Sequence, residues 1–340
     1  MLEINLPDLE TDQVLRLAKE VSEMQIQEPV TVNANMRWVR PFGLLYTVSI
    51  LKELRKKNPT IPFYMHVGDT NAVNYAAHMG FFKSVSMSIS YGKEPGEAEG
   101  NSYYLPITQI STNYLQQEAV KQGNYWALGD VIECEAKRLA SILSQGNKEV
   151  AQLLAYIIRE IIRNTPEHAE TDTVWMCGQY WRDGTAEIAI MDEGIGILKS
   201  LQKNRIHRQY VVDDEVALQS CVKAGISQAF DPSQKNKSND QWSNSGYGLY
   251  VVSQLCSNLS GSFCIASGEK YVHVGKNGKT RIGDTHIQGT AVKMTISANQ
   301  LKNAKEVIQK VAMEGQQQAK TIRYAFKHAS TPSKGLMGID

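Results

Sequence analysis

The sequence predicts an α+β protein made of two regions with different patterns. Residues 29–80 alternate between short β-rich runs and amphipathic helical stretches, which is typical of an α/β unit with parallel strands. A long helical stretch follows at about 130–164, and strand candidates bounded by turn residues occupy 172–191 and 262–296. The 340 residues suit about two domains of roughly 150 residues each.

The first α/β unit begins with a predicted strand at 29–34. Residues 41–57 are predicted to form a helix, because Pro41 stands at its start and lysine and arginine stand at its end, where cations favour the helix dipole. Residues 61–67 are a second strand candidate.

A second helix of this unit is expected to follow the 61–67 strand. Asp69 or Thr70 is its expected N-cap, and Gly80 its expected stop. Residues 91–100 are predicted to be a polar loop, and the pattern over 101–125 favours no single element.

The second region begins with helical periodicity that is interrupted near residues 145–147. Two predicted strands, 172–180 and 185–191, are separated by turn residues and indicate a hairpin. The strongly polar run 231–246 is predicted to be a mobile loop, and residues 248–259 return to a helical pattern.

Four strand candidates and one helix complete the sequence. Asn277 and Gly278 predict a type I′ turn between two of the strands. The strand candidates are 262–267, 270–275, 280–287 and 290–296, and an amphipathic helix is expected at about 299–313, followed by a polar tail. We therefore expect a domain at 1–125, a second at 126–298, and a helix with a tail at 299–340.

Composition limits the class of protein. The 36 basic and 35 acidic residues leave a net charge of +1, which argues against nucleic-acid binding through bulk charge. No apolar run approaches the roughly 18 residues that a membrane span requires, and the acidic first residues do not resemble a secretory signal. Five scattered cysteines without a C-x-x-C pair favour a reducing compartment, so we expect a cytoplasmic protein without a membrane partner.

The first motif with chemical potential is Glu160-Ile-Ile-Arg-Asn164 in the predicted helix. Residues four apart share a helix face, and this face lies opposite the isoleucines of the same helix. A carboxylate can orient or deprotonate a water molecule, and an amide oxygen can bind Mg²⁺. A solvated helix face is the alternative for this motif alone.

The second motif, Asp192-Glu-Gly194-Ile-Gly196, directly follows a predicted strand. Two glycines around one residue allow a tight turn and a close approach to a ligand. A carboxylate at a strand end can accept a hydrogen bond from an exocyclic amine. An ordinary strand-to-loop turn is the alternative.

The third motif, Gly246-Tyr247-Gly248-Leu249, opens the helix that follows the polar loop. The free amides at a helix start attract anions, and glycines let a phosphate come close. A loop that simply ends at a helix explains it equally well in isolation.

The fourth motif is Gly289-Thr290, at the start of the last predicted strand. A threonine hydroxyl can bond a ligand or an ordered water molecule. Taken singly, the residue is an ordinary β-branched strand residue.

The four motifs in this order resemble the GHKL ATP-binding superfamily, which includes DNA gyrase, the heat-shock chaperone, MutL, histidine kinases and anti-sigma-factor kinases. The resemblance covers roughly residues 132–298 and implies a Bergerat-type α/β sandwich that binds ATP with Mg²⁺.

The resemblance also implies roles for individual residues. Glu160 looks like the water-activating carboxylate, Asn164 like the Mg²⁺ ligand and Asp192 like the acceptor of the adenine amine. The remaining matches are the turn at Gly194 and Gly196, the phosphate-facing segment Gly246, Tyr247, Gly248 and Leu249, the lid at 226–245, and Thr290 at the adenine-side water.

Residues 164–169, NTPEHA, are similar to the N-x-x-x-H-A stretch of anti-sigma-factor kinases. Pro166 departs from that pattern, because proline removes one helical hydrogen bond beside His168. Arg163 also departs, since gyrase-like members carry an acid beside the asparagine.

The first region resembles a STAS-like domain, with Gly80-Phe-Phe82 after its second helix. Such domains are partners and phosphorylation targets of anti-sigma-factor kinases, but this chain has no D-S-S-G-type acceptor before its helix at Pro41. A small α/β domain used for packing or partner binding is the alternative.

Three functions are consistent with these residues. The first is a slow ATPase or nucleotide switch whose lid controls an interface with another protein or a second copy of the chain. The second is a serine/threonine kinase of the anti-sigma type acting on a STAS-like partner. The third is a non-enzymatic module that binds nucleotide.

Overall fold

The computed structural model of the protein describes residues 1–85, 89–121, 128–228 and 246–325. The described strands form two sheets, one of three strands and one of five. The predicted mobile loop and the lid lie outside the described residues, except for their ends at 226–228 and 246.

The first sheet contains three parallel strands in the order β1-β2-β3. The strands are β1 (Leu2–Asn5), β2 (Val30–Ala34) and β3 (Phe63–Val67), with Leu2, Val30 and Phe63 in register. Helices α1 (Thr11–Glu23) and α2 (Pro41–Lys57) connect the strands. Parallel neighbours need such crossovers, so this region is the predicted α/β unit.

Local signals account for the helices predicted in this region. Pro41 occupies the first turn of α2, and the three cations at its end lie in its last turn. The Thr70 side chain accepts a hydrogen bond from the Val73 amide at 3.1 Å and caps α3 (Asn71–His78). A short helix, α4 (Phe81–Ser84), follows Gly80. The predictions for 29–34, 41–57 and 61–67 are therefore confirmed.

The second sheet has the order β4-β5-β6-β8-β7, and all its pairs are antiparallel. Its strands are β4 (Tyr104–Ser111), β5 (Thr173–Tyr180), β6 (Thr185–Asp192), β7 (Ser262–Val274) and β8 (Thr280–Ser297). The predicted hairpin is β5 and β6, whose residues Tyr180 and Ala186 pair nearest the turn.

Helices surround this sheet. The longer ones are α6 (Leu128–Leu143), α7 (Lys148–Asn164), α10 (Gly248–Asn258) and α11 (Ala304–Thr321). The shorter ones are α5 (Thr112–Lys121), α8 (Gly196–Gln202), α9 (Asp214–Cys221), the π-helical turn η1 (Thr165–Ala169) and the 3₁₀ turns η2 (His207–Gln209) and η3 (Ala298–Asn303).

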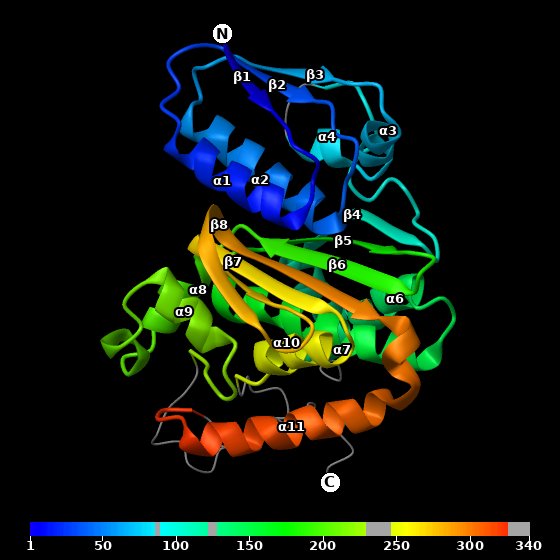
Figure 1. Ribbon diagram of the computed structural model, residues 1–340, viewed down its shortest axis with the longest axis vertical. Coiled ribbons are helices and arrows are strands. Elements are labelled where there is room, and N and C mark those ends of the chain that lie inside the picture. Colours follow the sequence, from blue (N-terminus) through cyan, green and yellow to red (C-terminus); the bar gives the residue numbers. More distant parts are fainter. Residues whose placement is uncertain (86–88, 122–127, 229–245, 326–340) are drawn as a thin grey trace.

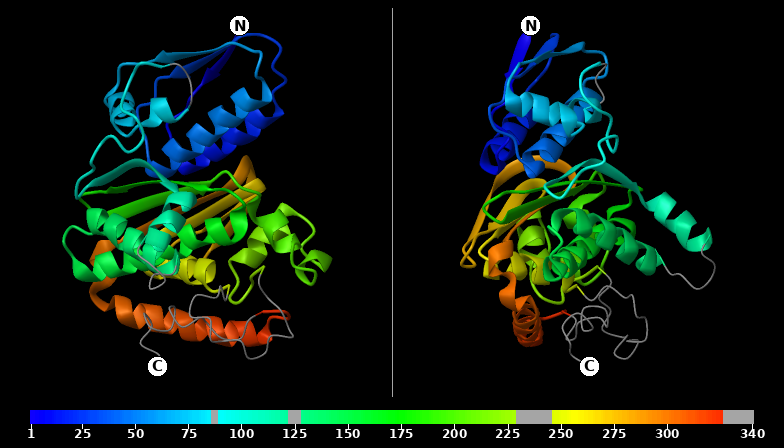
Figure 2. Two further views of the ribbon diagram at one scale, coloured as in Figure 1. Left: turned by 180° about the vertical axis from the view of Figure 1, so that it is seen from behind. Right: turned by 90° about the vertical axis from the view of Figure 1, so that its right-hand side faces the viewer.

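The elements are stacked in layers (Figure 1). From top to bottom in that view lie the three-stranded sheet, helices α1 and α2, the five-stranded sheet, helices α6, α7 and α10, and finally α11. The two views in Figure 2 show the same stacking from behind and from the side. The five-stranded sheet is thus covered on both faces, and the predicted α+β class is confirmed.

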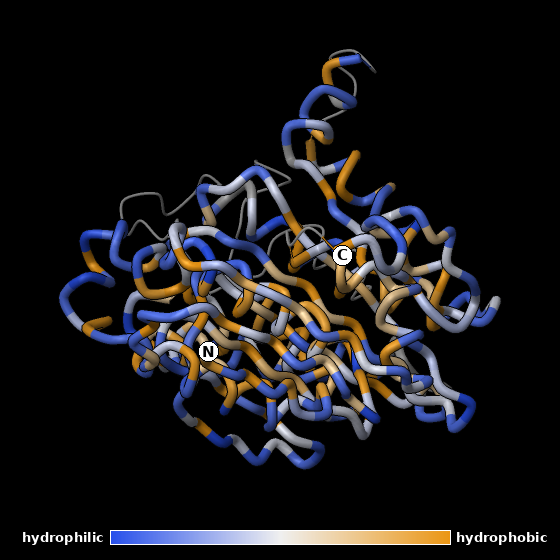
Figure 3. Tube along the Cα trace, turned by 90° about the horizontal axis from the view of Figure 1, so that it is seen from above, coloured by the Kyte–Doolittle hydropathy of each residue, from blue (hydrophilic) through white to orange (hydrophobic). Residues whose placement is uncertain are grey.

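Alternating side chains of the five-stranded sheet enter two different cores. On β6, Ile188 and Ile190 pack with α7 and α10, whereas Ala189 and Met191 pack with α1 and α2. The same alternation occurs on β5 and β7. Viewed from above, apolar residues concentrate along the central elements (Figure 3).

Polar contacts fix α2 and α1 to the sheet. The fully buried Glu187 of β6 accepts a hydrogen bond from the Phe42 amide at 3.1 Å, and Arg40 Nη1 lies 3.6 Å from its other oxygen. The carboxylate therefore accepts a hydrogen bond from an amide in the first turn of α2, where the helix dipole favours negative charge. On α1, Thr11 Oγ1 accepts from Lys293 Nζ of β8 at 2.8 Å.

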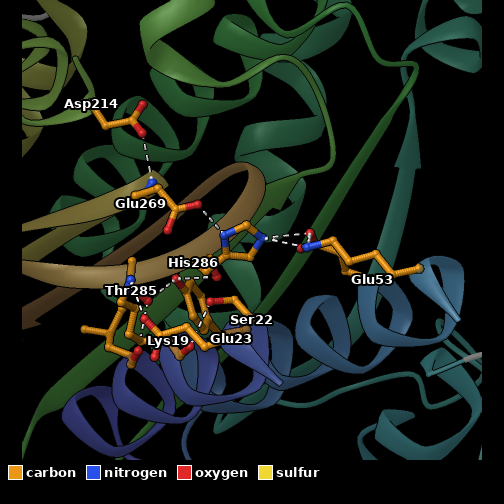
Figure 4. A network of polar contacts seen from close by, with 11 residues as sticks. Lys19, Ser22, Glu23, Glu53, Asp214, Glu269, Thr285 and His286 are labelled. Carbon is orange, nitrogen blue, oxygen red and sulfur yellow. Dashed lines mark hydrogen bonds and ion pairs between the residues drawn. The ribbon is translucent and has the colours of Figure 1, made fainter. Parts of the chain in front are cut away.

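A chain of polar groups continues this attachment at the other end of α2 (Figure 4). His286 of β8 lies between Glu53 Oε1 of α2, at 2.7 Å, and Glu269 Oε1 of β7, at 2.6 Å. The Glu269 amide donates to Asp214 Oδ2 at 2.9 Å, which extends the chain to α9.

Some elements differ from the prediction. The four strand candidates at 262–296 are two long strands, because register shifts around Gly268 let β7 continue past the glycine. A turn lies at the predicted place, but the predicted type I′ is wrong: the Gly278 amide donates to the Gly275 carbonyl at 3.1 Å, and of the two central residues, Lys276 and Asn277, only Asn277 has positive φ. The predicted helix at 299–313 was misplaced: residues 298–303 form a 3₁₀ turn, and α11 continues to Thr321.

Three segments for which no element was predicted are structured, and one of them, residues 196–221, contains α8, η2 and α9. Residues 2–23 form β1 and α1, and residues 104–121 form β4 and α5. Strand β4 pairs with β5 although it precedes position 125, where we expected a domain boundary. The division into domains and the STAS-like character of the first region stay predictions.

Within the described segments, no helix is both long enough and apolar enough to cross a membrane.

We predict that Glu187→Ala destabilises the protein by about 2 kcal/mol, because the Phe42 amide is left buried without an acceptor. Urea denaturation of the full chain measures the change. Glu187→Gln is the matched control, because its amide oxygen can still accept the bond, and it should lose clearly less stability. Equal midpoints for Glu187→Ala and the wild type would contradict this role.

Candidate functional site

A pocket lies on the α7 and α10 face of the five-stranded sheet, at the end of β6. It is bounded by the end of α7, by η1, by α8 and by the start of α10. Residues from all four sequence motifs line it. These are Asn164, Asp192, Gly196, Gly246, Gly248, Leu249 and Thr290.

The other three predicted site residues lie beside the pocket without lining it. Glu160 is one helical turn before Asn164 on α7 and is 8% exposed. Gly194 packs against η1, and Tyr247 is buried in the core beneath the start of α10. The alternative of a solvated helix face is therefore wrong for Glu160.

The Glu160 carboxylate is held by an arginine on its own helix. Arg159 donates to Glu160 Oε1 from Nη2 at 2.5 Å and from Nε at 3.2 Å. Arg159 Nη1 also donates to Glu133 Oε2 of α6 at 3.1 Å. Because Arg159 is only 3% exposed, this ion pair is shielded from solvent and orients Glu160 firmly.

The second glycine of the third motif lies directly against Glu160. A Cβ atom at Gly248 would be 2.5 Å from Glu160 Oε2, so a side chain there would displace the carboxylate from its position beside Arg159. Glycine at this position thus brings the start of α10 up to the carboxylate. The first and third motifs form one structural unit, although more than 80 residues separate them.

Asp192 is a buried carboxyl at the end of β6. Its Oδ1 accepts from the Gly194 amide at 2.9 Å, and its backbone pairs with Thr290 of β8. Burial raises the pKa of Asp192 to about 6, while hydrogen bonds from the Gly194 and Thr290 amides act in the opposite direction. The group is ionised at pH 7 and can accept a further hydrogen bond.

The loop after Asp192 is tightly packed. A Cβ atom at Gly194 would be 2.1 Å from the Ala169 carbonyl oxygen of η1. The Ile195 amide donates to that same oxygen at 2.8 Å. Gly289, with φ of +90°, leaves space for the Asp192 carbonyl, so the loop is held from two sides.

Beside Asp192 the pocket wall is apolar. A flat heteroaromatic ring would be buried there, with one polar anchor to fix its orientation. The apolar lining residues include Ile161, Ile190, Ile197, Leu201, Ile265 and Val292.

The two described ends of the predicted lid meet at the pocket. The Gly225 amide donates to the Gly246 carbonyl at 3.1 Å. A Cβ atom at Gly246, where φ is +72°, would be 2.4 Å from the Ile226 carbonyl oxygen. The segment between them therefore leaves and rejoins the fold at one place, beside the start of α10.

The pocket also contains residues that we did not predict as site residues. Thr165 and His168 lie on η1, within NTPEHA, so their sequence position was a usable signal. No local pattern marked Ser200 and Cys221, whereas Ser227 and Gln228 lie at the start of the lid predicted at 226–245. Ser200 Oγ donates to Gln228 Oε1 at 3.0 Å.

The donor set suits a metal ion only in part. Asn164 lines the pocket, and its side-chain amide includes an oxygen of the kind that binds Mg²⁺. In the described part of the chain, no three or more His, Cys, Asp or Glu side chains are grouped to bind a metal. A hard cation at Asn164 would need further oxygen ligands from a bound molecule and from water. Mg²⁺ in phosphate-binding sites is usually coordinated in this way.

Comparison with known proteins agrees with the geometry. No curated protein matches the chain. Residues 149–300 match the family model described as histidine kinase-, DNA gyrase B- and HSP90-like ATPase. This segment includes α7, η1, β5 to β8 and α10, and thus all four motifs. Residues 149–300 are therefore similar to a GHKL-type ATP-binding domain, and the α/β sandwich observed here fits that family.

Proposed function

We propose that the protein binds ATP with Mg²⁺ and hydrolyses it slowly, as a switch whose lid controls a protein interface. The observation that carries the proposal is the pocket itself, in which residues from four distant motifs converge. The match of residues 149–300 to the ATPase family supports ATP as the ligand.

The chemistry of the pocket suggests how ATP is oriented. Asp192 would accept a hydrogen bond from the adenine amine, with the ring against the apolar wall and Thr290 at the adenine-side water. The amides at the start of α10, beside Gly246 and Gly248, would face the phosphates. Asn164 would hold Mg²⁺, which neutralises charge on the phosphates when bound.

Hydrolysis would depend on Glu160. Arg159 occupies Oε1, while Oε2 points to Gly248 at the phosphate end of the pocket. A water molecule that donates a hydrogen bond to Oε2 could be aligned or deprotonated there.

The lid would convert nucleotide binding into a change at an interface. Its described ends meet at Gly225 and Gly246, next to the expected phosphates. Contacts between phosphates and a segment anchored in this way can order it, and loss of the γ-phosphate can release it. A second copy of the chain or another protein would recognise the ordered form.

A kinase of the anti-sigma type is the alternative, favoured by His168 of NTPEHA in the pocket lining. The first region lies on the opposite face of the five-stranded sheet from the pocket, so the geometry favours a target on another molecule (Figure 1). Transfer of radiolabel from the γ-phosphate to serine or threonine of a partner would favour the kinase. A passive nucleotide-binding module remains the third candidate.

We predict that Asn164→Ala weakens Mg²⁺–ATP binding by more than about 100-fold, because it removes a direct metal ligand. Isothermal titration calorimetry measures the affinity. Asn299→Ala, which changes an exposed asparagine in η3, is the control and should bind as the wild type does. Equal affinity of Asn164→Ala and the wild type would reject the proposed metal role.

Nucleotide affinity should fall as the pH drops through about 6, because protonated Asp192 loses an acceptor site for the adenine amine. Calorimetry between pH 5 and 8 tests this, and Asp192→Asn corrects for titration of the phosphates. Identical binding profiles for Asp192→Asn and the wild type would contradict the assignment.

The folding stability should change in the opposite sense. The pKa of Asp192 in the folded state lies above the model value of 3.8, so its contribution to the free energy of unfolding rises as the pH falls from about 6 to about 4.

Glu160→Gln should keep ATP binding but lower phosphate release by about 10²- to 10⁴-fold, the usual effect of losing a general base. A coupled phosphate assay on the full chain gives the rate. Glu133→Gln changes the second carboxylate bound by Arg159, outside the pocket, and should have a much smaller effect. Unchanged release from Glu160→Gln would mean that hydrolysis is not its task.

A further inference from the structure

Strand β6 carries functional residues on both of its faces. Ile190 and Asp192 contribute to the pocket, whereas Glu187, Met191 and the next residue in phase, Glu193, lie toward α2. The two carboxylates are at opposite ends of this face. Glu187 binds the start of α2, and Glu193 contacts α2 near its other end.

The contact of Glu193 is an ion pair with Lys52 of α2. Lys52 Nζ donates to Glu193 Oε1, and the two side chains are 23% and 32% exposed. The ammonium group also lies 4.9 Å from the centre of the Trp175 ring on β5. Such a cation–π contact adds to the attraction and fixes Lys52 in place.

Glu193 has little freedom to move away from Asp192. A Cβ atom at Gly289 would be 2.8 Å from Glu193 Cα, and Gly194 packs against Ala169 on the other side. The charge of Glu193 is therefore held on the α2 face of the sheet, one residue from Asp192. Burial is the main cause of the raised pKa of Asp192, and the charge of Glu193 adds to it.

We propose that Lys52 is a positioning residue for nucleotide recognition: through its ion pair with Glu193, helix α2 of the first region sets the affinity of the pocket on the opposite face of the sheet. Lys52 neutralises the charge beside Asp192 and anchors the loop that carries it. This inference rests on the proposed function, since it concerns the affinity of the same site.

Two other charged residues of α2, Glu53 and Lys57, take part in a different set of contacts. Lys57 Nζ pairs with Glu53 Oε1 at 2.8 Å, and Glu53 continues to His286 and Glu269 on the β7–β8 ribbon (Figure 4). Lys57 is therefore a control on the same helix, with the same type of ion pair but no contact with the Asp192 loop.

Among the described residues, few titratable groups face Asp192. His168 of η1 and Cys221 of α9 line the same pocket, and Glu193 follows Asp192 in its loop. Burial raises the pKa of Cys221 to about 12, so that thiol stays neutral in the pH range of interest. Neither His168 nor Cys221 is altered by a substitution at Lys52.

A double-mutant cycle on the full chain tests the proposal, with Mg²⁺–ATP affinity measured by calorimetry. Lys52→Met keeps an unbranched apolar stem over Trp175 and should weaken binding about 3- to 10-fold at pH 7. It should also move the pH midpoint of binding upward, because Glu193 is no longer neutralised. Lys52→Arg should restore both values, and Lys57→Met should change neither.

The decisive comparison uses Glu193→Gln, which removes the charge that Lys52 neutralises. Lys52→Met should have no further effect on affinity or on the pH midpoint in that background. Wild-type affinity in Lys52→Met, or equal losses with and without Glu193→Gln, would overturn the inference. Absence of ATP binding by the wild type would instead refute the proposed function, and with it this extension. Thermal melts of each variant separate loss of folding from loss of binding.

Discussion

The burial of both faces of the five-stranded sheet is the constraint on which the rest of the structure depends. Successive side chains of a strand point to opposite faces, so a strand buried on both sides must serve two cores. On β6 the result is a pocket carboxyl, Asp192, with Glu187 and Glu193 directed to α2. The first region is consequently part of the support for the pocket.

Close packing explains why the motifs contain glycine at particular positions. At each of three positions, the absence of a Cβ atom lets a neighbouring group come close. Gly248 lies against the Glu160 carboxylate, Gly194 against the Ala169 carbonyl and Gly246 against the Ile226 carbonyl. In each case the partner comes from a different motif or from the lid base. The glycines therefore hold separate parts of the site at contact distance.

The elements that could be predicted from sequence are those with strong local signals. Helix α2 begins at Pro41 and ends with three cations, and the β5–β6 hairpin has apolar runs on both sides of its turn. Helix α1 has no side-chain N-cap, and β4 contains Pro106 at an irregularity of an edge strand, so neither had such a signal. Strand β7 was divided at Gly268 because a bulge cannot be distinguished from a turn in one sequence.

In the candidate site too, only residues that a sequence motif marks could be predicted. The motif residues could be found because the resemblance supplied their order, and NTPEHA pointed to His168. Ser200 and Cys221 reach the pocket through the folding of distant helices, and no sequence motif around them marked them. The ion pair between Lys52 and Glu193 joins two regions that local patterns treat separately, so only the tertiary structure could identify it.

The central claim is that one ATP molecule lies between α7 and α10, with its adenine at Asp192 and its phosphates at the start of α10. A crystal structure with Mg²⁺ and a non-hydrolysable ATP analogue tests this most directly. The account predicts the adenine amine within hydrogen-bond distance of the Asp192 carboxylate and the metal at Asn164. An empty pocket at saturating analogue, or the analogue bound elsewhere, would contradict it.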